Sequence, residues 1–289
     1  MSLPAIKHRL ISGFSIAGVL FAAFFFLPDA GIPFVLAALV ALMSLEFYQL
    51  MTAGGVANFR GYGTLGCVVL VFVTWFSGVR GDSDAWDSLV LFLVTIGIFL
   101  RQFPQKDNPH PLRTIGGTLF GILYVGLLWN FLTKLLLFGR PLGFAEGIYW
   151  PGRWLLLYAV FAAKFTDIGA YLIGCSFGRH KLIPRISPGK SWEGVFGGIL
   201  VGTFAGTLLV WGLRDVLSPL GLTPLRAIPL GIALSICGVV GDLTESLFKR
   251  AANVKDSGGV IPGMGGLLDV LDSILFTAPG VYLFLRLVA

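Results

Sequence analysis

Apolar residues in this chain occur in long, nearly uninterrupted runs rather than in strand-like alternation or narrow helical stripes. Runs of this kind are typical of helices that are apolar on every side, and one crossing of a bilayer needs about 20 such residues. Nine segments of the chain meet this length, and most are joined by short polar connections. The predicted spans are residues 10–27, 30–51, 61–80, 86–103, 115–138, 153–175, 193–213, 223–242 and 267–287.

The pattern therefore predicts an all-α, polytopic integral membrane protein with about nine transmembrane helices. Composition agrees, because only 12% of the residues are charged, against about 25% in soluble proteins. A mean hydropathy of +0.85 excludes a disordered chain and an ordinary soluble enzyme. The basic residues before the first span resemble the start of a signal peptide. No clear cleavage site follows them, so we expect a retained span.

The distribution of Lys and Arg predicts how the spans are oriented. With the N-terminus in the cytoplasm, the connections on the cytoplasmic side carry about twice as many Lys and Arg residues as those on the other side. This orientation also places the two longest connections, 176–192 and 243–266, in the cytoplasm, where nucleotides are found. The short connections and single-chain layout favour a bacterial inner (plasma) membrane.

The chain divides by character into two regions. Residues 1–150 are expected to form the N-terminal transmembrane helices, about five spans. Residues 151–289 contain the remaining spans, both long cytoplasmic connections and several charged residues at membrane depth, so we expect this region to be catalytic. No repeat of fixed period and no inverted pair of interrupted helices is visible in the sequence, which argues against a transporter.

Charged residues at membrane depth are costly, so each needs a reason. Charged residues three positions apart, and so on one helical face, occur within one predicted span, at the end of a second and at the start of a third. These pairs are Lys164 with Asp167, Asp242 with Glu245, and Asp269 with Asp272. Carboxylates beside glycine-rich, Lys- and Arg-rich connections indicate a hard divalent cation together with phosphate. The alternative is a set of mutually neutralised ion pairs that fix helix packing.

Residues 187–191 read Ser-Pro-Gly-Lys-Ser and precede a predicted helix that begins near Trp192. A full P-loop is excluded, because its first glycine would fall at Pro184 and no strand is expected before it. A helix N-terminus with a lysine beside it still favours phosphate. Ser187, Lys190 and Ser191 are therefore candidate substrate-binding residues. The alternative is an ordinary connection in which Ser191 caps the helix.

Residues 246–272 carry the most specific pattern in the chain. The order is Ser, two residues, Lys-Arg, four residues, Lys-Asp, a glycine-rich stretch and Asp-x-x-Asp. This pattern resembles the signature of the phosphatidate cytidylyltransferase (CDP-diacylglycerol synthase) family. Shorter blocks at 166–171 and 186–194 are similar to two further blocks of that family, while the N-terminal half matches only as hydrophobic helices. The matching signature positions are Ser246, Lys249, Arg250, Lys255, Asp256, Gly258, Pro262, Gly265, Gly266, Asp269 and Asp272.

The chain departs from the family signature at two positions. Met264 stands where the family has a histidine, and Val270 stands where it has an arginine. A methionine cannot transfer protons or bind a hard metal ion. However, a phosphate monoester has a second pKa of about 6, so a lipid phosphate is mostly a dianion at neutral pH and needs no general base. The missing histidine is therefore compatible with the family reaction.

The resemblance implies attack of the phosphatidic acid phosphate on the α-phosphorus of CTP, giving CDP-diacylglycerol and pyrophosphate. Such a reaction brings anions together, so metal ions and cationic side chains must neutralise their charge. We expect Asp242 and Asp269 to hold Mg²⁺, alone or with a second cation. Asp272 and Asp256 are further acidic candidates for catalytic residues. Lys249 is the one cationic candidate.

Cationic side chains and glycine backbone are expected to bind the phosphates. Arginine offers bidentate contacts, and glycines let backbone N–H groups approach an anion closely. Asp167 is included as a residue that orients a cation or the lipid headgroup. The candidate substrate-binding residues are Ser187, Lys190, Ser191, Ser246, Lys249, Arg250, Lys255, Gly265, Gly266 and Asp167, and the loop glycines expected to approach an anion are Gly258, Gly259, Gly263, Gly265 and Gly266.

The expected partners are CTP and phosphatidic acid in the bilayer. The family resemblance also implies a homodimer. No nucleic acid is expected, because the net charge of +6 is explained by the cytoplasmic excess of Lys and Arg and by anionic substrates. Two alternative enzymes stay open: a CTP-dependent lipid kinase of the polyprenol or phytol type, and a CDP-archaeol-type synthase. A transporter or an inactive scaffold is a less favoured alternative from a different class.

Overall fold

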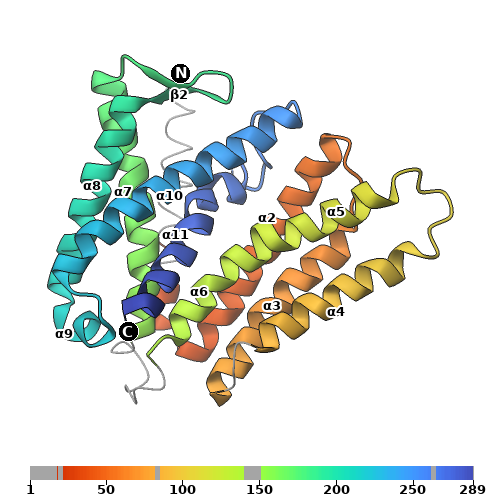
Figure 1. Ribbon diagram of the computed structural model, residues 1–289, viewed down its shortest axis with the longest axis horizontal. Helices are drawn as coiled ribbons and strands as arrows, with labels where there is room; N and C mark the ends of the chain where they lie inside the picture. The colour runs from red at the N-terminus through yellow and green to blue at the C-terminus, as the bar shows by residue number, and fades with distance from the viewer. Residues whose placement is uncertain (1–17, 19–21, 82–84, 140–150, 262–264, 289) are drawn as a thin grey trace. The chain divides into compact units, whose positions relative to one another are not determined.

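The computed structural model describes residues 18, 22–81, 85–139, 151–261 and 265–288 of the chain. Within these residues, eight helices are long and apolar enough to cross a membrane (Figure 1). They are Asp29–Ala53 (η1, Asp29–Gly31, and α2, Ile32–Ala53), Arg60–Arg80 (α3), Ala85–Gln102 (α4), Pro111–Leu137 (α5, Pro111–Gly121; the π-helical η2, Ile122–Leu127; α6, Leu128–Leu137), Pro151–Phe177 (α7), Trp192–Gly212 (α8), Pro224–Ala251 (α10) and Leu267–Val288 (α11). Two short helices, α9 (Arg214–Leu217) and η4 (Ser218–Leu220), join α8 to α10.

These helices confirm the predicted helical, multi-pass membrane architecture, to which the described residues add one short β-hairpin. Each of the eight corresponds to one of the predicted spans. The remaining predicted span, 10–27, falls mostly outside the described residues. The count of nine spans therefore stays a prediction, as does the cytoplasmic side of the N-terminus.

The predicted connection 243–266 is wrong over its first part, because α10 continues to Ala251. The prediction followed the fall in hydropathy after residue 242. Polar side chains do not end a helix by themselves, and no Gly or Pro occurs between residues 242 and 251. The helix ends just before Asn253, which adopts the left-handed conformation (φ 55°) common after helix C-termini. Lys249 and Arg250 in the last turn complement the helix dipole.

The predicted connection 176–192 contains a β-hairpin at the shared end of α7 and α8 (Figure 1). Strand β1 (Lys181–Ile183) pairs antiparallel with β2 (Ser187–Ser191), so the Ser-Pro-Gly-Lys-Ser segment is extended rather than looped. Helix α8 begins at Trp192, as predicted. The Ser191 hydroxyl accepts a hydrogen bond from the Gly194 N–H at 3.2 Å and caps the helix.

The chain forms two compact units. The first comprises Met1–Thr133 and Phe248–Leu271, and the second comprises Lys134–Leu247 and Asp272–Ala289. Residues 248–271, which belong to the predicted C-terminal region, therefore group with the N-terminal helices. The C-terminal end of α10 and the N-terminal end of α11, which follow one another in the sequence, belong to this first unit.

Aromatic side chains form much of the core of the first unit. Phe47 of α2 and Phe120 and Tyr124 of the α5–η2 segment surround Phe248, with ring centroids 5.2–5.7 Å from that of Phe248. Tyr48, next to Phe47, is fully buried and donates a hydrogen bond to the Thr118 carbonyl at 2.8 Å. Because Phe248 lies near the end of α10, this cluster ties that end to the N-terminal helices.

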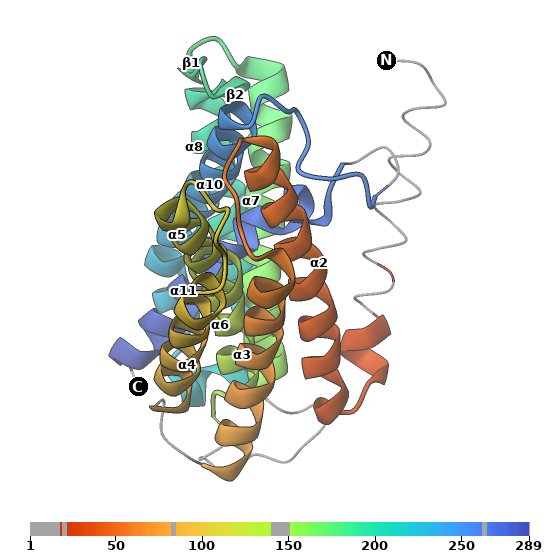
Figure 2. The same cartoon turned by 90° about the vertical axis from the view of Figure 1, so that its right-hand side faces the viewer.

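Glycines allow α7 and α8 of the second unit to pack closely side by side (Figures 1 and 2). A Cβ added at Gly169 of α7 would lie 2.6 Å from the Val201 Cβ and 2.8 Å from the Gly197 carbonyl oxygen of α8. Small residues at such crossings are typical of membrane helices, whose association depends on close packing rather than on burial from water. This packing places the hairpin, with its candidate lysine, at the end of a closely packed pair of helices.

Candidate functional site

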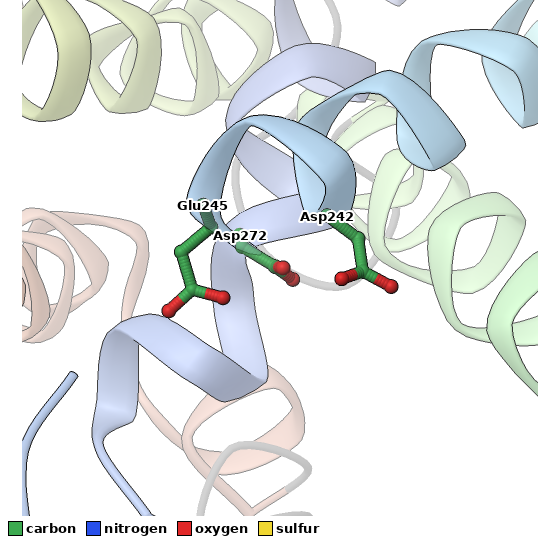
Figure 3. A group of neighbouring side chains, drawn as sticks. All are labelled: Asp242, Glu245 and Asp272. Carbon is green, nitrogen blue, oxygen red and sulfur yellow. The ribbon is translucent and has the colours of Figure 1, made fainter. Parts of the chain in front are cut away.

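Three carboxylates gather in the second unit, and we call Asp242, Glu245 and Asp272 the acidic cluster (Figure 3). Asp242 and Glu245 lie one turn apart on α10, and Asp272 lies on α11. One oxygen from each side chain lies within 4.8 Å of the others. Three carboxylates from two helices thus converge on one small volume.

A glycine brings the two helices together at this point. Gly241 immediately precedes Asp242, and a Cβ at Gly241 would lie 3.0 Å from the Asp272 carbonyl oxygen and 3.4 Å from the Ser273 Cα. A larger residue there would separate α10 from the α11 backbone. The close approach of the helices is what places carboxylates from both of them side by side.

The acidic cluster is largely withdrawn from the surface. Glu245 and Asp272 are 1% and 4% exposed, while Asp242 is half-buried. Carboxylates this close repel one another and lose hydration, so they need compensating cations. An all-oxygen donor set of this kind is the one that Mg²⁺ and similar hard divalent cations prefer. The residues therefore fit a divalent metal ion.

Lys190 supplies positive charge beside the acidic cluster. Its Nζ lies 2.7 Å from Oδ2 of Asp242, so the β2 strand reaches α10 through this ion pair. Ser246 makes a longer contact, with its hydroxyl 3.4 Å from the other Asp242 oxygen. The structure thus brings together three predicted site residues from two separate sequence blocks: Asp242, Lys190 and Ser246.

A second polar group surrounds Asp167 of α7. Its Oδ2 is 3.0 Å from the Lys164 Nζ and accepts a hydrogen bond from the Ser273 hydroxyl, also at 3.0 Å. Ser273 is the neighbour of Asp272 on α11 and also lies 3.2 Å from the Lys164 Nζ. Lys164 and Asp167 therefore form the ion pair considered above, and Ser273 ties that pair to the helix that bears Asp272.

Asp269, predicted beside Asp242 as a metal ligand, lies in the first unit among hydrogen-bond donors. Its Oδ1 is 2.6 Å from the Lys249 Nζ, and its Oδ2 accepts bonds from the Ser257 N–H and hydroxyl, both at 2.9 Å, and from the Gly266 N–H at 2.7 Å. Among the described residues, the acidic cluster contains Asp272 and Glu245 rather than Asp269. A metal-binding role for Asp269 stays a prediction.

The remaining signature residues lie between α10 and α11, and we call the described part of this segment, residues 252–261 and 265–266, the glycine loop. Lys255 and Asp256 are exposed, as is Arg250 in the last turn of α10. Gly265 has φ +97°, a conformation that only glycine adopts without strain. Gly259 has open space around its Cα, so no close contact explains it. The predicted positions Pro262, Gly263 and Met264 lie outside the described residues.

Two predicted serines have different surroundings. Ser191 is buried and its hydroxyl is used as the helix cap, which is the alternative considered for it. Ser187, at the start of β2, is half-buried. Their roles in substrate binding stay predictions.

Two acidic residues near these groups were not assigned by sequence reasoning. Glu245 belongs to the acidic cluster, and its spacing of three from Asp242 was the signal that could have placed it there. Glu46 of α2 is 3% exposed and lies against the glycine loop. Its only sequence signal was a lone carboxylate within a predicted apolar span.

Comparisons with known proteins extend well beyond the signature. The sequence profile of the cytidylyltransferase family matches residues 7–288. The chain is similar to a phosphatidate cytidylyltransferase of Chlamydia pneumoniae, with 31% identity covering 97% of this chain and 90% of that protein. It is also similar to one of Bacillus subtilis, with 28% identity covering 97% and 98%. For a chloroplastic relative from Arabidopsis thaliana, the identity is 32% over 95% of this chain and 69% of the relative. The similarity therefore includes the N-terminal helices, which sequence reasoning matched only as hydrophobic segments.

Proposed function

The chain belongs to the cytidylyltransferase family, and from this we propose that it transfers the cytidylyl group of CTP to phosphatidic acid. The products are CDP-diacylglycerol and pyrophosphate. The observation that carries the proposal is the acidic cluster with Lys190 beside it, in a chain similar over nearly its whole length to phosphatidate cytidylyltransferases.

The acidic cluster is the proposed site for Mg²⁺. When bound, the metal ion would neutralise charge on the CTP phosphates and on the departing pyrophosphate. Asp242, Glu245 and Asp272 supply only oxygen donors, within 4.8 Å of one another. The contacts of Asp269 support a different part for it, that of holding Lys249 and the glycine loop. A second cation stays a prediction.

Cationic residues are proposed to bind the triphosphate. Lys190, held at Asp242 by a 2.7 Å ion pair, is supported as a phosphate ligand that works next to the metal site. Lys249 is oriented by its 2.6 Å contact with Asp269. Arg250 and Lys255 are exposed and carry charge into the region of the glycine loop. These assignments follow the signature spacing, and the charge of each side chain matches its proposed ligand.

The lipid phosphate needs no protein base in this reaction. It is largely a dianion at neutral pH, since its second pKa is about 6, and it can attack the α-phosphorus directly. The chain's task is therefore to bring two anions together and to balance their charge. Met264 and Val270, in place of the family histidine and arginine, are compatible with this chemistry. Asp167, tied to α11 through Ser273, is proposed to orient the lipid headgroup or a cation.

The proposed location is a bacterial inner (plasma) membrane, crossed nine times, with the N-terminus and the active site facing the cytoplasm. The excess of Lys and Arg in the connections on that side supports this orientation. The lipid substrate would enter from the bilayer and CTP from the cytoplasm. A homodimer is proposed from family resemblance alone.

The experiment that tests the function is label transfer by the purified protein in liposomes that contain phosphatidic acid and Mg²⁺. Parallel reactions carry CTP labelled at the α- or at the γ-phosphate. We expect lipid labelled only from the α position, with release of pyrophosphate. Absence of transfer from a folded protein, with either label, would contradict the proposal.

The same assay separates the two enzymatic alternatives. Label that reaches an added polyprenol or phytol only from the γ position would identify a lipid kinase. Transfer from the α position to an archaeol-type ether lipid phosphate, and not to phosphatidic acid, would identify a CDP-archaeol-type synthase. Flux of a substrate without bond cleavage would identify a transporter.

A further inference from the structure

The beginning of α11 must satisfy backbone N–H groups that have no acceptor within the helix. One of them is satisfied locally, because the Gly266 N–H donates to Oδ2 of Asp269 at 2.7 Å. Asp269 is the third residue of α11, and a side chain at this position that bonds back to the residue before the helix forms half of a capping box. The next two N–H groups, those of Leu267 and Leu268, donate to a residue that is distant in the sequence.

That acceptor is Glu46, near the end of α2. Its Oε1 accepts a hydrogen bond from the Leu267 N–H at 3.0 Å, and its Oε2 accepts one from the Leu268 N–H at 2.8 Å. Both contacts are buried and join residues of the first unit that are more than 200 positions apart in sequence. The positive end of the helix dipole favours a carboxylate at this position. Glu46 is therefore a second, long-range cap for α11.

The glycine loop packs directly against this carboxylate. A Cβ at Gly258 would lie 2.6 Å from Oε1 of Glu46, and a Cβ at Gly266 would lie 2.6 Å from Oε2. Two of the loop's glycines are thus needed where the backbone passes a protein carboxylate. The sequence pattern predicted that these glycines let backbone N–H groups approach a substrate phosphate, and that role stays a prediction. In the structure, the group beside Gly258 and Gly266 is the Glu46 carboxylate.

We infer that Glu46 is a positioning residue for the glycine loop and for the Lys249–Asp269 pair, which the proposed function assigns to CTP binding. Glu46 holds the first turn of α11, Asp269 lies in that turn, and Asp269 in turn holds Lys249 and Ser257. The expected effect of Glu46 on CTP kinetics rests on the proposed function. The structural contact itself is independent of any activity.

The substitution Glu46→Gln tests this role with little change in volume. A glutamine has one acceptor oxygen, and its NH2 group would face a backbone N–H donor, so one of the two contacts is lost. We expect kcat/KM for CTP to fall by about tenfold to a hundredfold, the range that corresponds to one hydrogen bond to a charged group. The loss should appear mainly as a higher KM for CTP, with the KM for phosphatidic acid little changed. Glu46→Asp keeps both oxygens and the charge, so it should retain more activity than Glu46→Gln.

A matched control is Asp87→Asn in the same unit. Asp87 is 7% exposed, lies on a membrane-spanning helix and accepts a hydrogen bond from the Thr74 hydroxyl at 2.6 Å. This control also neutralises a buried carboxylate, but one whose hydrogen bond is to Thr74 of α3. We expect it to leave the KM for CTP unchanged. Equal losses of CTP affinity in both variants would overturn the inference, because they would indicate general destabilisation.

Hydrogen exchange in nanodiscs gives a readout that does not depend on activity. Peptides covering residues 265–269 should exchange faster in Glu46→Gln than in the parent protein or in Asp87→Asn. If the parent protein transfers no label, the proposed function fails while this measurement still tests the contact. If the parent transfers label and Glu46→Gln keeps both the parent exchange rates and the parent KM for CTP, the inference is overturned.

Discussion

The Asp242 carboxylate has neighbours of both charges: a lysine ammonium on one side and two further carboxylates on the other. The Lys190 ammonium is 2.7 Å from one of its oxygens, while Glu245 and Asp272 present further carboxylate oxygens. A lysine and a divalent cation both compensate carboxylates, so both compete for Asp242. We therefore expect that a metal ion bound at the acidic cluster would release Lys190 for a phosphate, which would link metal loading to substrate binding through one side chain.

Removal of the charge of one acidic-cluster residue should abolish turnover. We expect Asp242→Asn and Asp272→Asn each to lower kcat by more than about a hundredfold, because a metal site loses an anionic oxygen donor. Label transfer measures the rate, and binding of Mn²⁺, followed by its electron paramagnetic resonance signal, measures the metal site directly. Asp215→Asn is the control, since Asp215 is 94% exposed and lies outside the cluster. Near-parental rates in both cluster variants would contradict the metal assignment.

Lys190→Met should change two affinities in opposite directions. Without CTP, divalent cations should bind about fivefold more tightly, which corresponds to removal of a competing ion pair of about 1 kcal/mol. With Mg²⁺ saturating, the KM for CTP should rise, because a phosphate ligand has been lost. Titration with Mn²⁺ alone and steady-state kinetics check the two effects. Weaker binding of Mn²⁺ alone would mean that Lys190 supports the metal site rather than competing with it.

At the scale of elements, the glycines of α7, α8 and α10 determine how closely the helices approach. Gly169 faces Val201 of α8, and Gly241 faces the backbone of α11 beside Asp272. Glycine is otherwise unfavourable within a helix. The close contacts therefore explain why glycines occur at these positions within apolar spans.

Two glycine-to-alanine substitutions, one at the crossing of α7 and α8 and one away from it, should change the stability of the protein in opposite directions. Gly169→Ala should lower stability by about 1–3 kcal/mol, because its Cβ would lie 2.6 Å from the Val201 Cβ and force the helices apart. Gly116→Ala on α5 should raise stability by about 0.5–1 kcal/mol, since a Cβ there meets nothing within 4 Å and alanine favours the helix. Unfolding of the detergent-solubilised protein measures both changes. Equal shifts at the two sites would contradict close packing of α7 against α8.

At the scale of the whole molecule, the number of spans determines where the two ends of the chain lie. Eight membrane-spanning helices are described, and the sequence predicts a ninth span at residues 10–27. An odd number of spans places the termini on opposite sides of the membrane.

Labelling of single cysteines should find the N-terminus in the cytoplasm and the C-terminus outside. Cysteines are introduced as Ser2→Cys or Ala289→Cys after Cys67, Cys175 and Cys237 have been replaced by serine or alanine. A membrane-impermeant maleimide applied to intact cells should then modify only the C-terminal cysteine. Equal labelling of both positions would place the termini on one side and contradict a ninth span.

Most of the fold could be predicted because its signals are local. Apolar length located all eight described helices that are long enough to cross a membrane, and Ser191 identified the start of α8. The end of α10 was missed because hydropathy falls at residue 242 while the helix continues to Ala251. In the candidate site, the three-residue spacing of charges at the ends of predicted spans singled out Asp242 and Asp272 as acidic candidates. The same spacing could not show that Asp269 is bonded to Lys249, since three-residue spacing places side chains on one face without naming their partners.

The sequence by itself determined that this is a multi-pass helical membrane protein and that it resembles the cytidylyltransferases. Apolar run length and motif spacing are properties of neighbouring residues, so they need no tertiary information. Only the tertiary structure decided that Glu245 joins Asp242 and Asp272, and that Glu46 caps α11. A carboxylate in an apolar helix has the same sequence signal whichever donor it meets. Its partner is decided by which helices pack together and by the glycines that let their backbones approach.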